Sequence, residues 1–168
     1  NTAEDTVLTL NPADLLGNDV DMDNDLLHID SVQNAMAGTV TWNGTNVLFT
    51  PATNFNGPAS FAYTIGDGYF FTTGTVNVTV TPVNDPPIVN AGADQAVRVN
   101  SIVTLDGTGS SDVDGDALTY QWSFISMPPK SKAKLKGGDI LVNPTFKADK
   151  EGTYVISLIV NDGTVSSG

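Results

Sequence analysis

Two short stretches of this chain crowd aspartates together, and their carboxylates have the clearest potential for chemistry. The first stretch, "NDVDMDNDLLHID" at residues 18–30, carries five aspartates in thirteen residues. The second, "SSDVDGDALTY" at residues 110–120, carries three. Like charges a few ångströms apart repel one another unless a cation neutralises them. Calcium takes about six to eight hard oxygen ligands, and alternating aspartates on a tight loop supply several of them. We therefore expect calcium at both loops.

The distribution of charge supports a metal cation over other partners. The net charge is -12, and residues 1–85 hold ten acidic residues without a single Lys or Arg. Residues 86–168 hold nine acidic residues and all seven basic ones. The first half therefore has no counter-ion of its own, and it would repel the phosphate backbone of a nucleic acid. We expect metal ions as partners and no nucleic acid.

Two other interpretations of the first aspartate loop remain beside the calcium site expected here. Four aspartates fit ligand positions one, three, five and twelve of an EF-hand loop: Asp19, Asp21, Asp23 and Asp30. Position six of that loop requires Gly and finds Asn24, and the flanking residues read as strands. The loop could also be a solvated acidic turn, but the first half has no basic residue to balance it.

Catalytic chemistry is not expected. The acid and base of a glycosidase face each other across a cleft, whereas these aspartates share one loop. A Ser-His-Asp arrangement would depend on His28, the single histidine, and no nucleophile elbow accompanies it. We expect His28 to be an ordinary strand residue, and we predict that the chain is not an enzyme.

The elements that position these loops are predicted to be short strands. Alternation is clear in "GTVNVTVTPVNDPP", residues 74–87, where three valines share one face and polar residues share the other. The prolines at its end stop the strand and form a short, rigid linker. We place the domain boundary there, giving an all-β chain of two domains, residues 1–85 and 86–168. The chain has no cysteine and no apolar run of about 18 residues, so we expect no disulfide and no membrane span.

The two halves contain similar sequence motifs in the same order. "DMDNDLLHI" at residues 21–29 aligns with "DVDGDALTY" at 112–120, and "YTIGDG" at 63–68 aligns with "LIVNDG" at 158–163. Asn24 aligns with Gly115, and both residue types accept positive φ, so both loops should turn at the same place. A long strand follows Asp67-Gly68, whereas only "TVSSG" follows Asp162-Gly163. We expect the second domain to lack its last strand, through truncation rather than because another chain donates that strand.

These residues resemble two known families of extracellular domain. The first half, with "EDTVLTL", "LLGNDVDMDND" and the closing "VNVTVTPVNDPP", resembles the cadherin-like tandem repeats of large bacterial surface proteins. The second, with "NAGADQAVRVNSIVTLDGTGSSDVDGDALTYQWSF" and "GTYVISLIVNDG", resembles the PKD (polycystic kidney disease) domain. The resemblance implies two immunoglobulin-like or cadherin-like β-sandwiches in tandem, joined by a short proline-containing linker. It also implies a secreted or bacterial cell-surface location.

The resemblance also implies a set of calcium ligands, because cadherins bind calcium between successive domains. Carried over by motif, the junction ligands would be Glu4, Asn84, Asp85, Asp112, Asp114 and Asp162. The corresponding site at the top of the first domain would use Asp21, Asp23 and Asp67, completed by a preceding domain. Pro82 and Pro86 replace two polar linker positions of the cadherin pattern. We therefore expect one or two calcium ions per junction.

The resulting hypothesis is a pair of calcium-stabilised spacer or adhesion modules of a large bacterial surface or secreted protein. Their partners would be neighbouring domains of the same protein. The alternative is a carbohydrate-binding or accessory module of a secreted polysaccharide-degrading enzyme or protease.

A basic stretch, "KSKAKLK" at residues 130–136, adds a second candidate surface. On a strand its four lysines would share one face. They could protect a sheet edge from aggregation, contact the acidic first half, or bind an anionic polysaccharide such as a cell-surface glycan.

Overall fold

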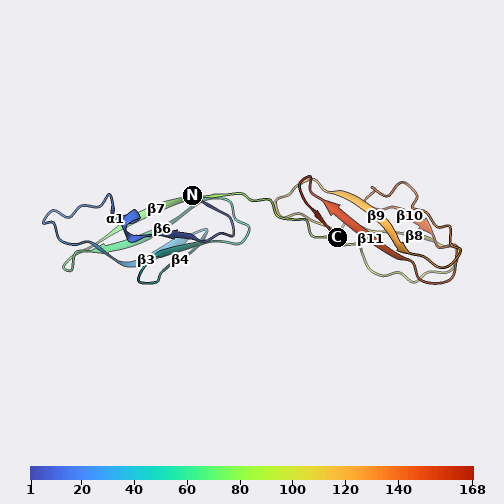
Figure 1. Ribbon diagram of the computed structural model, residues 1–168, viewed down its shortest axis with the longest axis horizontal. Helices are drawn as coiled ribbons and strands as arrows, with labels where there is room; N and C mark the ends of the chain where they lie inside the picture. Colours follow the sequence, from blue (N-terminus) through green and yellow to red (C-terminus); the bar gives the residue numbers. More distant parts are fainter. The chain divides into compact units, whose positions relative to one another are not determined.

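The computed structural model describes all 168 residues, and these form two compact units, Asn1–Val83 and Asn84–Gly168 (Figure 1). Each unit is described by itself below. Nearly all of the regular structure is β, as the alternation of apolar and polar residues predicts. The one α-helix, α1 (Pro12–Leu16), has five residues, and none of the chain's helical structure is long and apolar enough to cross a membrane.

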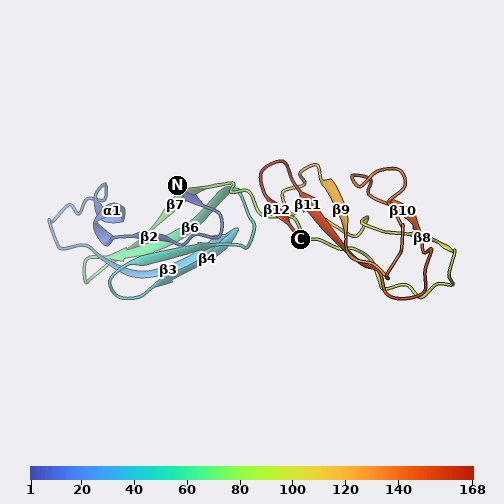
Figure 2. The same ribbon diagram turned by 45° about the vertical axis from the view of Figure 1, so that its right-hand side comes forward.

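The first unit contains two sheets that enclose one core (Figure 2). The larger sheet has the order β1-β7-β6-β3, with bounds Thr2–Ala3, Phe71–Thr81, Gly57–Gly66 and His28–Met36. The smaller has the order β2-β5-β4, with bounds Leu8–Leu10, Val47–Pro51 and Gly38–Trp42. Strand β7 pairs antiparallel with β6 and parallel with β1, so it lies between the two. This is the sandwich that the alternating sequence predicts.

The core of the first unit consists of side chains that alternate along these strands. Phe49 and Phe61 are fully buried and stack with their ring centres 5.8 Å apart. Val78 and Val80 of β7 are buried with them, while the polar residues between these valines remain exposed. Burial of alternate apolar side chains on one face fixes the register of β7, because a one-residue slip would turn that face toward water.

The second unit is a smaller set of two sheets around its own core. One has the order β12-β11-β9, with bounds Ser166–Ser167, Val155–Asn161 and Thr119–Ser126. The other pairs β10 (Thr145–Lys147) with β8 (Ile102–Thr104). Trp122 of β9, Phe146 of β10 and Val160 of β11 are at most 2% exposed and form the centre of this core.

The lysine-bearing stretch is not the strand that its alternation predicts. It is a loop: Lys130 has φ +64°, and only Lys136 makes a single β-bridge, to Thr145. The alternation instead lets the loop lie on the core, because Ala133 is buried and Leu135 half-buried while the lysines remain exposed. The predicted strand with a lysine face is therefore wrong, because this stretch has the backbone conformation of a loop.

Asp149 holds this loop against the second unit. Its carboxylate accepts hydrogen bonds from Ser131 Oγ at 2.6 Å, from the Lys132 backbone N–H at 2.8 Å and from Tyr154 OH at 3.0 Å. These bonds lower the pKa of Asp149 from 3.8 to about 2, and the bond from Ser131 has the largest effect. Hydrogen bonds to the Asp149 carboxylate therefore hold this loop in place, as pairing with a neighbouring strand would hold a strand.

We expect the Asp149 anchor to make the second domain acid-sensitive in a defined window. Its pKa is lower in the folded chain, so its contribution to stability is complete above about pH 4 and is lost as the pH falls toward 2. Asp149→Asn should flatten the fall of the melting temperature between pH 4 and pH 2, compared with the matched exposed variant Glu151→Gln. If the melting temperature falls equally steeply between pH 4 and pH 2 in both variants, the hydrogen bonds to Asp149 do not determine the acid sensitivity.

Candidate metal site

The loop before β9 is organised by one aspartate in the second unit. Asp112 Oδ1 accepts the backbone N–H of Asp114 at 2.9 Å and that of Asp116 at 3.3 Å. Gly115 supplies the positive φ of +80° on which the turn depends. These bonds bend the chain and bring the carboxylates of alternate residues close together. Ligand oxygens of Asp112, Asp114 and Asp116 all lie within 4.8 Å of one another.

One oxygen of this cluster has no partner within the protein. Asp112 Oδ2 is buried and accepts no hydrogen bond. A buried polar atom without a partner costs free energy, so this oxygen is able to accept a hydrogen bond from water or to coordinate a cation. The cluster therefore offers hard, anionic oxygen ligands of the type that calcium prefers.

The first residues of the second unit are hydrogen-bonded to these acids. The Asp85 backbone N–H donates to Asp114 Oδ2 at 2.8 Å. The Asn84 side-chain amide donates to Asp162 Oδ2 at 2.9 Å. The structure thus connects Asn84 and Asp85 to the loop after β11 and to the loop before β9.

Asp162 is the most buried acid of this group, at 7% exposure. Its Oδ1 accepts the backbone N–H groups of Thr164 at 2.6 Å and Val165 at 2.7 Å. The Asn84 amide, followed by these backbone donors, lowers the pKa of Asp162 below its usual value. Asp162 therefore stays anionic at neutral pH, which is the state that a calcium ligand must have.

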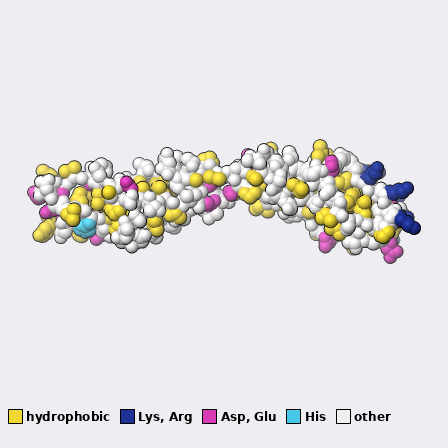
Figure 3. All heavy atoms as spheres, viewed as in Figure 1, with side chains coloured by type: hydrophobic (Ala, Val, Ile, Leu, Met, Phe, Trp, Pro, Cys, Tyr) yellow, Lys and Arg dark blue, Asp and Glu magenta, His cyan; other side chains and the backbone are white.

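The basic residues of the second unit do not neutralise the Asp112 cluster. The acidic loop precedes β9 and the lysine loop follows it. The eight residues of β9 span roughly 26 Å when extended and separate the ends of the two loops. Figure 3 shows the Lys and Arg side chains gathered at one end of this unit.

The first unit repeats both loop geometries. Asp21 Oδ1 accepts the backbone N–H groups of Asp23 at 2.8 Å and Asp25 at 3.0 Å, and Asn24 turns the chain with φ +65°. Asp67 Oδ1 accepts two backbone N–H groups, from Tyr69 at 2.6 Å and Phe70 at 2.7 Å, which lower its pKa. The turns therefore match those of the second unit.

The first unit does not gather its acids as closely as the second. No three acids there bring their ligand oxygens within the distance found for Asp112, Asp114 and Asp116. Asp21, Asp23 and Asp67 accordingly remain a predicted ligand set.

Glu4 belongs to the first unit, whereas the other five predicted junction ligands belong to the second. Its side chain is 3% exposed. One carboxylate oxygen accepts the Val83 backbone N–H, and the other, Oε2, is buried without a hydrogen-bond partner. Glu4 thus shares with Asp112 the property that one buried carboxylate oxygen has no hydrogen-bond partner.

The structure adds one candidate that the ligand prediction omitted. Asp116 belongs to the group of three acids, although only Asp112 and Asp114 were expected to bind. The signal was present in the spacing, because Asp112, Asp114 and Asp116 alternate in "DVDGD". A motif carried over from the cadherin pattern selects two of these three, whereas the turn brings all three together.

Comparison with known proteins agrees with this architecture. Residues 1–81 match the family model of the cadherin-like domain, and residues 91–168 match that of the K319L-like PKD domain. The chain is also 29% identical over 124 residues to Collagenase ColA of Clostridium perfringens (strain 13 / Type A). That match covers 73% of this chain and 10% of the collagenase, so the chain spans a small part of this relative.

Two solved structures share weaker similarity. They are an endo-fucoidan hydrolase from glycoside hydrolase family 107 and a single-residue variant of it, with identities of 20% and 22% and TM-scores of 0.36 and 0.38. Each covers 99% of this chain and 25% of the other. Similarity at this level supports no functional argument. The two family matches, together with two compact β units, identify the chain as a cadherin-like domain followed by a PKD domain.

Proposed function

We propose that the two domains are calcium-stabilised spacer modules of a larger bacterial surface or secreted protein. The observation that carries this proposal is the Asp112 cluster, where three carboxylates share a centre and one buried oxygen has no partner. Both domain types are typically non-catalytic modules. Similarity to a segment of Collagenase ColA supports a module that accompanies other domains.

The proposed ligands of the second domain are Asp112, Asp114, Asp116 and Asp162, with Asn84 and Asp85 beside them. Bound calcium would supply the positive charge that permits these carboxylates to lie close together. The Asn84 amide and the Asp85 N–H hold the linker residues to the same acids. An ion here would therefore restrain the start of the second domain, which is what a spacer requires.

Calcium should raise the melting temperature of the second domain. A ligand that binds only the folded state stabilises it, and millimolar calcium should shift the midpoint by roughly 5–10 °C relative to excess EGTA. The paired variant Asp112→Asn/Asp114→Asn should lose most of this shift, because each substitution removes an anionic ligand. The measurement is differential scanning calorimetry of the full chain.

The matched control is Glu151→Gln, an exposed acid in the same domain that lies outside the cluster. It should keep the calcium-dependent shift. Equal melts with calcium and with EGTA for the unmodified chain would remove calcium from the proposal, leaving the aspartates as solvated turns.

Glu4 should contribute to calcium binding through its unpartnered oxygen. Glu4→Gln retains an oxygen that can accept the Val83 N–H but removes the negative charge, so we expect at least about a threefold loss of calcium affinity. Isothermal titration with calcium measures this directly. If the substitution changes only the melting of the first domain and leaves the titration unaltered, Glu4 is not a ligand.

The second candidate function is a binding or accessory module of a secreted degradative enzyme, and the Collagenase ColA similarity favours its protease form. A carbohydrate-binding surface of exposed aromatic side chains has less support. Trp42 packs against the first core, although Tyr69 and Phe70 are exposed.

The exposed lysines remain the candidate surface for an anionic polysaccharide. If they bind one, the full chain should retain dextran sulfate at low salt, and Lys132→Ala/Lys134→Ala should weaken retention about threefold or more. Retention that is equal for this variant and for the unmodified chain would argue against a lysine patch. The readout is affinity chromatography with a salt gradient.

A further inference from the structure

Six positions of the chain place Asn or Asp directly before Gly, and such a pair can react with itself. Gly has no Cβ to shield its backbone nitrogen, so this nitrogen can attack the side-chain carbonyl carbon of the preceding residue and close a five-membered ring. When the side chain is that of Asn, ammonia is lost and the residue ends as a carboxylate. The six pairs are Asn43-Gly44, Asn56-Gly57, Asp67-Gly68, Asp106-Gly107, Asp114-Gly115 and Asp162-Gly163.

Five of these six side chains are held by hydrogen bonds from the backbone. In four of them Oδ1 accepts the N–H two residues ahead, at distances between 2.6 and 3.0 Å. In the fifth, Asp114 Oδ2 accepts the Asp85 N–H at 2.8 Å. Asn56 is the exception, because its side chain makes no hydrogen bond. The four with the shared geometry are Asn43, Asp67, Asp106 and Asp162.

The two Asn-Gly pairs therefore differ in how firmly the Asn is held. Asn43 Oδ1 accepts the N–H groups of Thr45 at 2.9 Å and Asn46 at 2.7 Å, and the Asn43 N–H donates to Asn46 O at 3.2 Å. This turn connects the paired strands β4 and β5. Ring closure requires both the side chain and the backbone of Asn to rotate, so Asn43 must first lose these bonds. Asn56 has no side-chain bond to lose.

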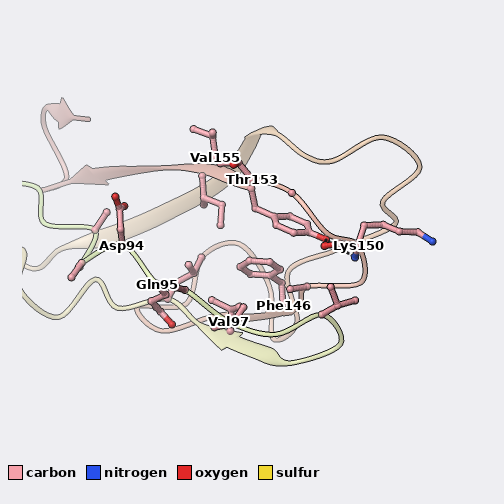
Figure 4. A pocket seen from close by; sticks show the side chains of 18 of the residues that line it. Asp94, Gln95, Val97, Phe146, Lys150, Thr153 and Val155 are labelled. Carbon is pink, nitrogen blue, oxygen red and sulfur yellow. Dashed lines mark hydrogen bonds between the residues drawn. The ribbon is translucent and has the colours of Figure 1, made fainter.

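Access to water does not separate the two Asn-Gly pairs. Both Asn side chains are exposed on the first unit. An open groove of about 700 Å³ belongs to the second unit, where Val97 and Val155 lie on opposite sides of Phe146 (Figure 4). None of the six pairs lines that groove. The relative reactivity of Asn43 and Asn56 therefore depends on their hydrogen bonds.

We propose that Asn56 is a site of self-modification, at which its side-chain amide is replaced by a carboxylate without an enzyme. The Gly57 nitrogen loses its proton to solvent and attacks Asn56 Cγ, so that an N–Cγ bond forms, the Cγ–Nδ2 bond breaks and ammonia leaves. One water then opens the ring. Cleavage of the N–Cγ bond gives aspartate, and cleavage of the original peptide bond to Gly57 gives isoaspartate. The sum of the steps consumes one water and releases one ammonia.

The reacting pair lies where the loop after β5 meets β6, whose first residue is Gly57. The Asn54 N–H in this loop donates to Asp5 Oδ1 at 3.1 Å, so the loop is already attached to one acid. Residues 1–85 hold ten acidic residues and no basic one, so their net charge would change by one, from -10 to -11. The modified unit would attract cations more strongly and repel polyanions more strongly.

The experiment incubates the full chain in mildly alkaline buffer, which promotes loss of the proton from the Gly nitrogen. The first unit has no Lys or Arg, so chymotrypsin replaces trypsin in the digest. Cleavage after aromatic residues releases the two pairs in separate peptides, "NGTNVLF" and "NGPASF", in which mass spectrometry follows the loss of each amide. We expect Asn56 to react at least about fivefold faster than Asn43, because two hydrogen bonds hold the Asn43 side chain.

The matched control is the same chain unfolded in urea, where the turn is lost and the two pairs should react at similar rates. Asn56→Gln should remove the new acidic species from an ion-exchange profile of the folded chain, because Gln would have to close a less favourable six-membered ring. Equal rates for Asn43 and Asn56 in the folded chain, or a faster Asn43, would overturn the proposal. An Asn56 that reacts in urea but stays intact in the folded chain would also overturn it.

Discussion

The hydrogen bonds that backbone amides donate to Asp21 and Asp112 are the constraint on which both acidic loops depend. Each aspartate accepts the N–H groups two and four residues ahead, and this bends the chain tightly enough to bring neighbouring carboxylates together. The bend works against the mutual repulsion of those carboxylates. Without a cation, repulsion between the carboxylates destabilises a loop of this shape. A bound cation would reduce that repulsion.

The sandwich provides fixed points for these loops. In the second unit, Trp122 and Val160 anchor β9 and β11 in the core, so the loop that precedes β9 and the loop that follows β11 begin from rigid ends. Asn84 and Asp85 are hydrogen-bonded to acids in both loops. The linker is thus attached to the same carboxylates that would hold an ion, which couples its order to their charge.

Much of this organisation could be read from alternation and repetition. The valines of β7 alternate so regularly that its strand and its buried face follow directly, and the aligned "DMDND" and "DVDGD" motifs predict turns that both units adopt. The lysine loop could not be read in this way, because its anchor, Asp149, lies 17 residues beyond Lys132 and the lysines themselves alternate like a strand. The apolar residues of "AVRV" at 96–99 also alternate like a strand but form none, since a strand forms only where a neighbour is present to pair with it. Helix α1 was also not expected, because five residues with a proline at the start carry almost no periodic signal.

The separation of acids and lysines within the second domain has an electrostatic consequence. The aspartate loop precedes β9 and the lysine loop follows it, so the charge of the domain is distributed unevenly along that strand. In the field of a polyanion, such as a highly charged surface polymer, the domain would experience a torque that turns its lysine loop toward the polymer and its aspartate loop away. Calcium bound to the aspartates would reduce the negative pole and weaken that torque. An ion bound at the proposed site would therefore also alter how strongly the domain aligns near a charged surface.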